Sequence, residues 1–236
     1  MEILLIIIAA LLPAVLLFFY IWRMDPRPEP MGWLVRGILF GVAICFPVAF
    51  IEMVIQGVLF GAGQENMTLV ETTMQAFFVA AIPEESAKLL MLWLLLRRNP
   101  FFDEHFDGII YAVCIGLGFA ALENIFYLFG YGDEWFSVAI TRALLAVPGH
   151  YAFGVLMGYY YSIYHFIDRR PTIAVSILMV PVLAHGCYDT LAMSGMASPA
   201  LGGVSFLVLI YFCVRMHKFA RSRMLAQIER DKGTTA

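Results

Sequence analysis

Seven long apolar segments divide this chain, and they constrain its fold more than any other feature. Each holds about 20 mostly apolar residues, the length at which an α-helix crosses ~30 Å of hydrocarbon. The 61% of hydrophobic residues and the mean hydropathy of +0.81 exceed what the core of a water-soluble domain needs. The sequence therefore predicts an all-α, polytopic transmembrane bundle of about seven helices. The predicted spans are Ile3–Trp22, Trp33–Phe60, Thr68–Leu96, Gly108–Phe129, Trp135–Tyr164, Thr172–Met193 and Leu201–Val214.

The connections between these segments are short and leave no room for a separate soluble domain. We expect one integral membrane domain over residues 1–236, with its core helices at about 68–193 and a basic tail at about 215–236. The lipid bilayer is then the solvent of the protein. The formal net charge of -3 and the scattered basic residues give no reason to expect nucleic acid as a partner.

Basic residues lie at alternate junctions of the predicted spans, and the other junctions have none. Because loops rich in Lys and Arg stay in the cytoplasm, we expect the N-terminus outside and the C-terminus in the cytoplasm, in a bacterial cell membrane. The tail is expected to form an amphipathic helix on anionic lipid. The basic positions are Arg23, Arg27, Arg97, Arg98, Arg169, Arg170 and those from Arg215 to Lys232, and the junctions without Lys or Arg are 61–67, 130–134 and 194–200.

Ionisable side chains lie inside several of these spans, where an unpaired charge costs at least a few kcal/mol. The third span carries Glu84 and Glu85 near its midpoint. At helical spacing Lys88 is within reach of both carboxylates. One carboxylate can therefore be neutralised locally while the other stays available for chemistry.

Three later spans each add polar groups at bilayer depth. The fourth carries Glu123 and Asn124 after two glycines that favour close helix packing, which indicates that Glu123 faces the bundle interior. The fifth carries His150 near mid-depth, and the sixth carries His185 and Asp189 one turn apart on one face. Two imidazoles with several carboxylates are the donor set of a zinc site. We expect the cavity around them to open towards the external leaflet.

A purely structural role competes with the functional one at each position. The adjacent glutamates could only pair with the nearby lysine, but two carboxylates exceed what one ammonium needs. Glu123 could orient a histidine while Asn124 faces the cavity. Asp189 is expected to orient the imidazole one turn away, or to line the cavity, rather than to bind metal. Arg142 and Glu52 also lie within spans, and their partners are left open by the sequence.

Four short motifs follow one another on successive predicted helices: Glu84-Glu85-x-x-Lys88, Phe119-x-x-x-Glu123-Asn124, His150-x-x-x-Gly154 and His185-x-x-x-Asp189. Together they resemble the PrsW family of intramembrane metalloproteases, over about residues 24–191. The Asp25–Pro30 linker looks like the segment that follows the first helix in that family. The related CAAX-processing and bacteriocin-immunity proteases would carry a histidine in place of Glu123, so the resemblance favours PrsW.

The resemblance implies an intramembrane endopeptidase that cleaves a single-pass membrane protein near the outer membrane face. In PrsW-like members this is the first cut in a membrane-anchored anti-sigma factor, which releases a stress response. The implied site residues are Glu84, Glu85, Glu123, His150 and His185. We expect the two histidines and Glu123 to hold zinc, and Glu84 or Glu85 to deprotonate a water. A metal-free glutamic-protease mechanism is left open by the sequence.

A proton- or cation-coupled transporter is the competing class, because intramembrane Glu and His residues can also form a proton relay. Transporters of this kind usually show internal repeats and a polar path to both membrane faces. The chain shows no evident repeat, and its polar residues do not continue to the cytoplasmic ends of the spans. The sequence therefore favours the protease.

Overall fold

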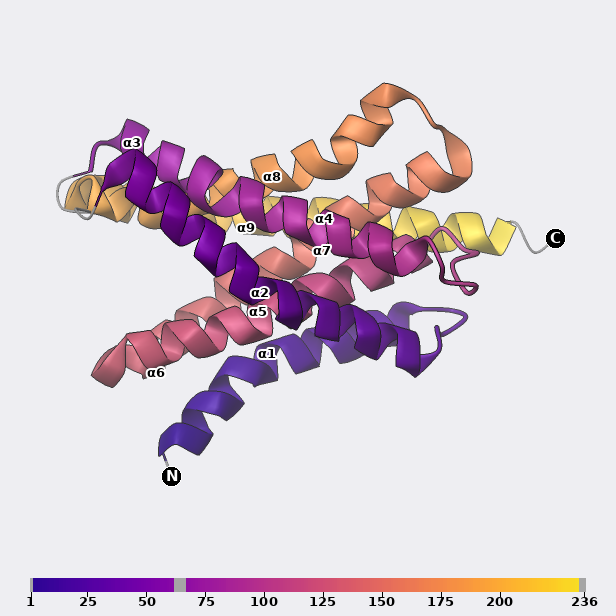
Figure 1. Cartoon of the computed structure of the whole chain (residues 1–236), viewed down its shortest axis with the longest axis horizontal. Coiled ribbons are helices and arrows are strands. Elements are labelled where there is room, and N and C mark those ends of the chain that lie inside the picture. The colour runs from indigo at the N-terminus through magenta and orange to yellow at the C-terminus, as the bar shows by residue number, and fades with distance from the viewer. Residues whose placement is uncertain (1, 62–66, 234–236) are drawn as a thin grey trace.

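The computed structural model describes residues 2–61 and 67–233, and in these ranges it contains helices and no strand. The all-α prediction is confirmed. Most of the predicted junction at 61–67 and the last three residues of the tail lie outside the described residues. The helices run roughly along one long axis, and the two termini lie at opposite ends of the bundle (Figure 1).

Six helical segments of the described chain are long and apolar enough to cross a membrane. The seventh predicted span, Thr68–Leu96, is also helical almost throughout, but it differs from these six segments in the charged side chains near its centre. The elements are α1 (Glu2–Met24), α2 (Met31–Phe60), α3 (Leu69–Met74), η1 (Gln75–Ala81), α4 (Ile82–Leu96), α5 (Asp107–Gly130), η2 (Gly132–Glu134), α6 (Trp135–Thr141), η3 (Arg142–Ala146), α7 (Val147–Ser162), η4 (Ile163–Ile167), α8 (Pro171–Met193), η5 (Ser194–Met196) and α9 (Pro199–Gly233).

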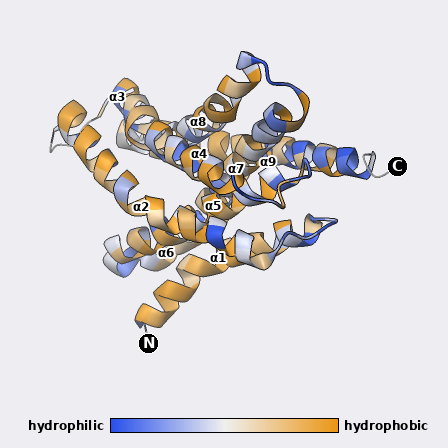
Figure 2. Ribbon diagram, turned by 45° about the vertical axis from the view of Figure 1, so that its right-hand side comes forward, coloured by the Kyte–Doolittle hydropathy of each residue, from blue (hydrophilic) through white to orange (hydrophobic). Residues whose placement is uncertain are grey.

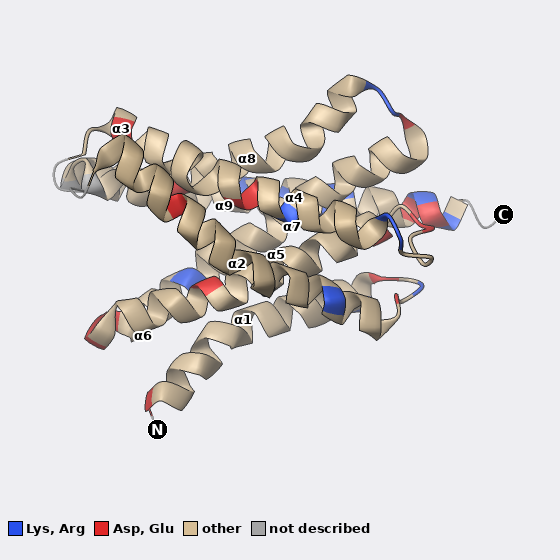
Figure 3. Ribbon diagram, in the orientation of Figure 1, with Lys and Arg blue, Asp and Glu red and all other residues tan. Residues whose placement is uncertain are grey.

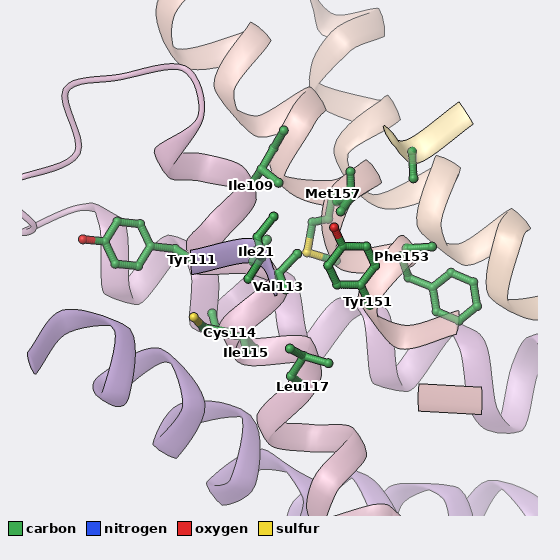
Figure 4. Packing of buried hydrophobic residues seen from close by; sticks show 14 of the residues in the cluster. Ile21, Ile109, Tyr111, Val113, Cys114, Ile115, Leu117, Tyr151, Phe153 and Met157 are labelled. Atoms are coloured by element: carbon green, nitrogen blue, oxygen red, sulfur yellow. The ribbon is translucent and has the colours of Figure 1, made fainter. Parts of the chain in front are cut away.

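Helix α5 forms the centre of the bundle and packs against α1, α2 and α7. Its residues from Asp107 to Ala120 are all buried. Figure 4 shows side chains of α5 meeting Ile21 of α1 and Tyr151, Phe153 and Met157 of α7. The polar residues described below are therefore held by a tightly packed apolar centre.

Glycines allow the backbones of these helices to approach closely. A Cβ at Gly118 would overlap the carbonyl oxygen of Ile38 on α2, and a Cβ at Gly158 of α7 would overlap that of Gly108 on α5. At Gly116 a Cβ would lie 3.0 Å from the carbonyl oxygen of His150. Because small residues let helices pack without a layer of side chains between them, this arrangement brings α7 and its histidine against α5.

The basic tail differs from the prediction. It continues the last span as part of the single helix α9, and apolar residues spaced four apart, among them Ala220, Met224 and Ile228, are buried. The Gln227 amide donates to the carbonyl oxygen of Tyr159 at 3.4 Å. The expectation of an amphipathic helix on anionic lipid is therefore wrong, because the apolar stripe of the tail packs on the bundle itself.

Charge and hydropathy divide the molecule along its long axis. The ribbon is apolar along most helices, and hydrophilic colour is concentrated in the connections and in the second half of α9 (Figure 2). Basic residues gather at the end of the bundle where the chain terminates, and a further charged group lies midway along α4 and near α6 (Figure 3). We call the end that carries Arg97, Arg169 and the end of α9 the arginine end. By the charge rule this is the predicted cytoplasmic end.

Candidate active site

Two glutamates begin α4 directly after a π-helical segment. Pro83, the second residue of α4, has no N–H and would crowd the preceding turn of a regular helix. The wider π-helical turn of η1 precedes it, as is frequent at functional sites. Glu84 and Glu85 follow at 4% and 0% exposure, so both carboxylates are buried in the bundle.

The Lys88 ammonium contacts both glutamates at the predicted helical spacing. Its Nζ lies 2.8 Å from Glu84 Oε2, 2.8 Å from Glu85 Oε1 and 3.1 Å from His150 Nδ1. Ligand atoms of the same three partners, Glu84, Glu85 and His150, lie within 4.8 Å of one another. This is the one group of metal-binding geometry found in the described chain, and the ammonium touches each of its members.

His150 links this group to α5. It stands near the start of α7, where the π-helical η3 and Pro148 repeat the pattern found before Glu84. Its Nε2 lies 3.0 Å from Glu123 Oε2. The imidazole therefore lies between the Lys88 ammonium on one side and the Glu123 carboxylate on the other.

His185 occupies the opposite side of the same group. Its Nδ1 lies 2.9 Å from Glu85 Oε1, and its Nε2 lies 3.2 Å from Asp189 Oδ2 and 3.9 Å from Glu84 Oε1. The ring stacks on Phe153 with centroids 4.7 Å apart. The two imidazole centroids are 5.4 Å apart. Asp189 thus contacts the imidazole one turn away, the position that the spacing predicts.

Arg142, whose partner the sequence left open, pairs with Glu123. Its Nη2 donates to Glu123 Oε2 at 2.6 Å and its Nε donates to Asn124 Oδ1 at 2.5 Å. The guanidinium also lies 3.8 Å from the ring centroid of Tyr127. Asn124 in turn donates to the carbonyl oxygen of Ala10 at 3.1 Å and lies behind the arginine. An arginine inside a span needs a carboxylate, but the sequence alone did not identify which one.

A cavity of about 700 Å³ joins these groups. It reaches Tyr131 and Met193, near the ends of α5 and α8 that lie away from the arginine end. Glu52 of α2 also lines it, with Oε1 buried and, among the described residues, without a hydrogen-bond partner. The polar lining residues are Glu52, Gln75, Glu84, Glu123, Tyr127, Tyr131, Ser137, Thr141, Arg142, His150, His185, Tyr188 and Asp189.

The charges of this cluster suit a divalent cation. Three carboxylates contact the two cations, Lys88 and Arg142, and a fourth, Asp189, contacts His185. These four carboxylates and two cations leave two negative charges when both imidazoles are neutral. Neutral imidazole and carboxylate are also the ligands that zinc prefers when no cysteine is present. Both the donor set and the charge balance fit a metal ion.

Comparison with known proteins shows which family the chain belongs to. The family described as PrsW family intramembrane metalloprotease matches residues 29–216, which contain all four motifs. The chain belongs to the PrsW family. It is 34% identical to "Protease PrsW" of Bacillus subtilis (strain 168), over 94% of this chain and 99% of that protein. It is also 34% identical to "Protease PrsW" of Geobacillus kaustophilus (strain HTA426), over 92% of each chain. No solved structure matches it.

PrsW membership confirms the resemblance seen in the four motifs. The chain is an intramembrane protease and a multi-pass bacterial membrane protein, and its substrates are membrane proteins.

Proposed function

We propose that this PrsW-family protease is a zinc-dependent endopeptidase that cleaves a single-pass membrane protein near the outer membrane face. Its substrate in this proposal is a membrane-anchored anti-sigma factor, in which it makes the first, site-1-type cut. The observation that carries the proposal is the meeting of two buried imidazoles with Glu84 and Glu85 beside one cavity. The cavity extends away from the arginine end, which supports a cut on the external side.

In this proposal His150, His185 and Glu123 hold the zinc ion. Both imidazoles are less than 5% exposed, and each already contacts a carboxylate that fixes its orientation. When bound, zinc supplies a Lewis acid for the scissile carbonyl and for the attacking water. Arg142 holds the Glu123 carboxylate in place by an ion pair.

Glu84 is the better placed of the two glutamates to act as the general base. Its carboxylate lines the cavity, whereas Glu85 is fully buried behind it and contacts His185. Glu84 takes the proton of the attacking water and delivers it to the nitrogen of the leaving amine. Glu85 orients the imidazole of His185, and Lys88 holds both carboxylates in position.

The substrate segment must unwind before it is cut, because the carbonyl groups of a helix are hydrogen-bonded and shielded. The cavity walls combine aromatic rings with buried charge, among them Phe126, Tyr127 and Phe153 beside Arg142. Such a lining can hold an extended stretch of a membrane segment and exclude lipid from the reacting carbonyl.

One contact favours a metal-free alternative. The Lys88 ammonium touches Glu84, Glu85 and His150, the three groups whose ligand atoms lie closest together. A glutamic protease would use this ammonium, in place of a metal ion, as the positive charge beside the carboxylates. Zinc analysis of active protein separates the two mechanisms.

The test is cleavage of a single-pass anti-sigma factor co-reconstituted with purified protein in lipid vesicles. Glu84→Gln is expected to reduce cleavage by at least about 100-fold, the lower end of what a lost general base costs. Glu85→Gln is expected to reduce it by about 10- to 100-fold, as loss of a partner that orients a histidine does. Glu134→Gln, in the exposed turn before α6, is the matched control and should cleave like wild type. Full cleavage by Glu84→Gln contradicts the assigned base. Cleavage of a generic membrane reporter but of no anti-sigma factor would contradict the substrate alone.

A further inference from the structure

A second cavity, of about 670 Å³, lies on a different face of α4 from the catalytic carboxylates. Ser86, Leu90, Trp93 and Arg97 of α4 form one wall, at a spacing that places them on one side of the helix. The other wall comes from η4, the connection after it and α8, including Arg169. In Figure 1, α8 begins well away from α4 at this end of the bundle.

Two guanidinium groups from separate segments meet at this cavity without an ion pair. Arg97 stacks on Trp93, with its Cζ 4.6 Å from the ring centroid, so its position is fixed. In the part of the chain that the structure describes, neither Arg97 nor Arg169 has a salt-bridge partner, whereas Arg170 pairs with Asp168 at 2.6 Å. Because guanidinium groups bind phosphate with two parallel hydrogen bonds, the cavity mouth suits a phosphate group.

Apart from Ser86 and His165, the remainder of the lining is apolar or aromatic. Leu90 and Trp93 are 51% and 46% exposed, so the cavity faces the surroundings of the bundle and not its interior. Phe102 and Tyr161 form an aromatic layer, with ring centroids 5.9 Å apart. Aromatic rings beside arginines are typical of the level at which lipid headgroups lie. An acyl chain fits this lining, and a free phosphate ion would leave the apolar part unused.

We propose that this cavity binds one anionic phospholipid, with its phosphate between Arg97 and Arg169 and an acyl chain running along Leu90 towards Ser86. Basic pockets between helices on the cytoplasmic side are suited to such headgroups. Ser86 directly follows Glu85, so the lipid fills the space behind the segment of α4 that carries the catalytic glutamates. The site depends on these contacts and not on the proposed zinc or substrate.

The experiment is a lipid titration of the full chain in mild detergent, in which bound lipid is measured by native mass spectrometry. The probes are phosphatidylglycerol and phosphatidylcholine with identical acyl chains. Arg97→Gln/Arg169→Gln should bind phosphatidylglycerol roughly 30-fold more weakly, which corresponds to about 2 kcal/mol for two arginines. The matched control Arg98→Gln/Arg170→Gln removes the same charge from the same end, at two positions that do not line the cavity, and should bind like wild type. Arg97→Lys/Arg169→Lys keeps the charge but loses the paired hydrogen bonds, so it should bind more weakly than wild type and more tightly than the cavity glutamine variant.

Three results would overturn the proposal. The first is equal loss in both glutamine double variants, because it would show attraction by general surface charge. The second is equal retention of the two lipids by wild type. The third is evidence that the site binds an anion without using the acyl chain. Displacement of the lipid by millimolar inorganic phosphate would show this, and so would lipid binding left unchanged in Leu90→Trp.

Discussion

Replacing Lys88 by methionine tests the charge balance at the centre of the cavity. The Nζ of Lys88 contacts Glu84, Glu85 and His150 within 3.1 Å, and the lysine is 4% exposed. Methionine keeps most of the side-chain volume but removes the ammonium, which leaves two adjacent carboxylates without a cation. Loss of one partner of a buried ion pair typically costs about 3–5 kcal/mol. For a chain of this size that predicts a melting temperature lower by roughly 6–20 °C.

The assay is thermal unfolding in detergent, monitored by tryptophan fluorescence. A chelator is present so that no metal ion replaces the ammonium. Lys218→Met, at an exposed lysine of α9, is the matched control and should melt with wild type. Lys88→Met/Glu84→Gln removes one of the two carboxylate charges and should regain part of the lost stability. A Lys88→Met protein that melts within about 1 °C of wild type would refute the reasoning, because the carboxylates would then not need the ammonium.

Three further predictions concern other parts of the bundle. Gly158→Ala should lower the free energy of unfolding by about 1–3 kcal/mol, because its Cβ meets backbone of α5, whereas Gly57→Ala, with open space around it, should not destabilise. Arg142→Gln should lower the free energy of unfolding by about 1–3 kcal/mol and reduce cleavage. Arg142→Lys should restore only part of the stability and part of the cleavage, because an ammonium cannot match the contacts of the guanidinium with Glu123 and Asn124. Burial raises the pKa of Glu29 to about 6. Because the folded chain then holds this proton more tightly than the unfolded chain, stability should fall as the pH rises from about 4.5 to about 6, and Glu29→Gln should flatten that slope.

The spans and the contacts between charged residues on one helix could be predicted because the bilayer makes strict demands on sequence. A helix that crosses it must be apolar for about 20 residues, so the seven segments are visible directly. For the same reason each charge inside a span stands out. The spacing of Lys88 from its two glutamates and of His185 from Asp189 fixed those contacts, because residues three or four apart share a helix face.

Contacts between helices that are distant in sequence could not be predicted in the same way. The pairing of Arg142 with Glu123 depends on how η3 lies against α5, and the approach of Lys88 to His150 depends on how α4 lies against α7. The π-helical segments before Pro83 and Pro148 also escaped prediction, because hydropathy does not distinguish a wide helical turn from a regular one. The tail was misjudged because its apolar stripe fits a lipid surface and a protein surface equally well.

The most direct test of the proposed mechanism is the zinc content of purified, proteolytically active protein by elemental analysis. His150→Ala and His185→Ala are measured beside wild type, with Glu134→Gln as the control and a thermal melt of each variant to establish folding. The account predicts about one zinc ion per chain in wild type and in the control, and loss of zinc with loss of cleavage in both folded histidine variants. Wild-type protein that cleaves its substrate without zinc would contradict it and would assign the chemistry to the glutamates and Lys88 alone.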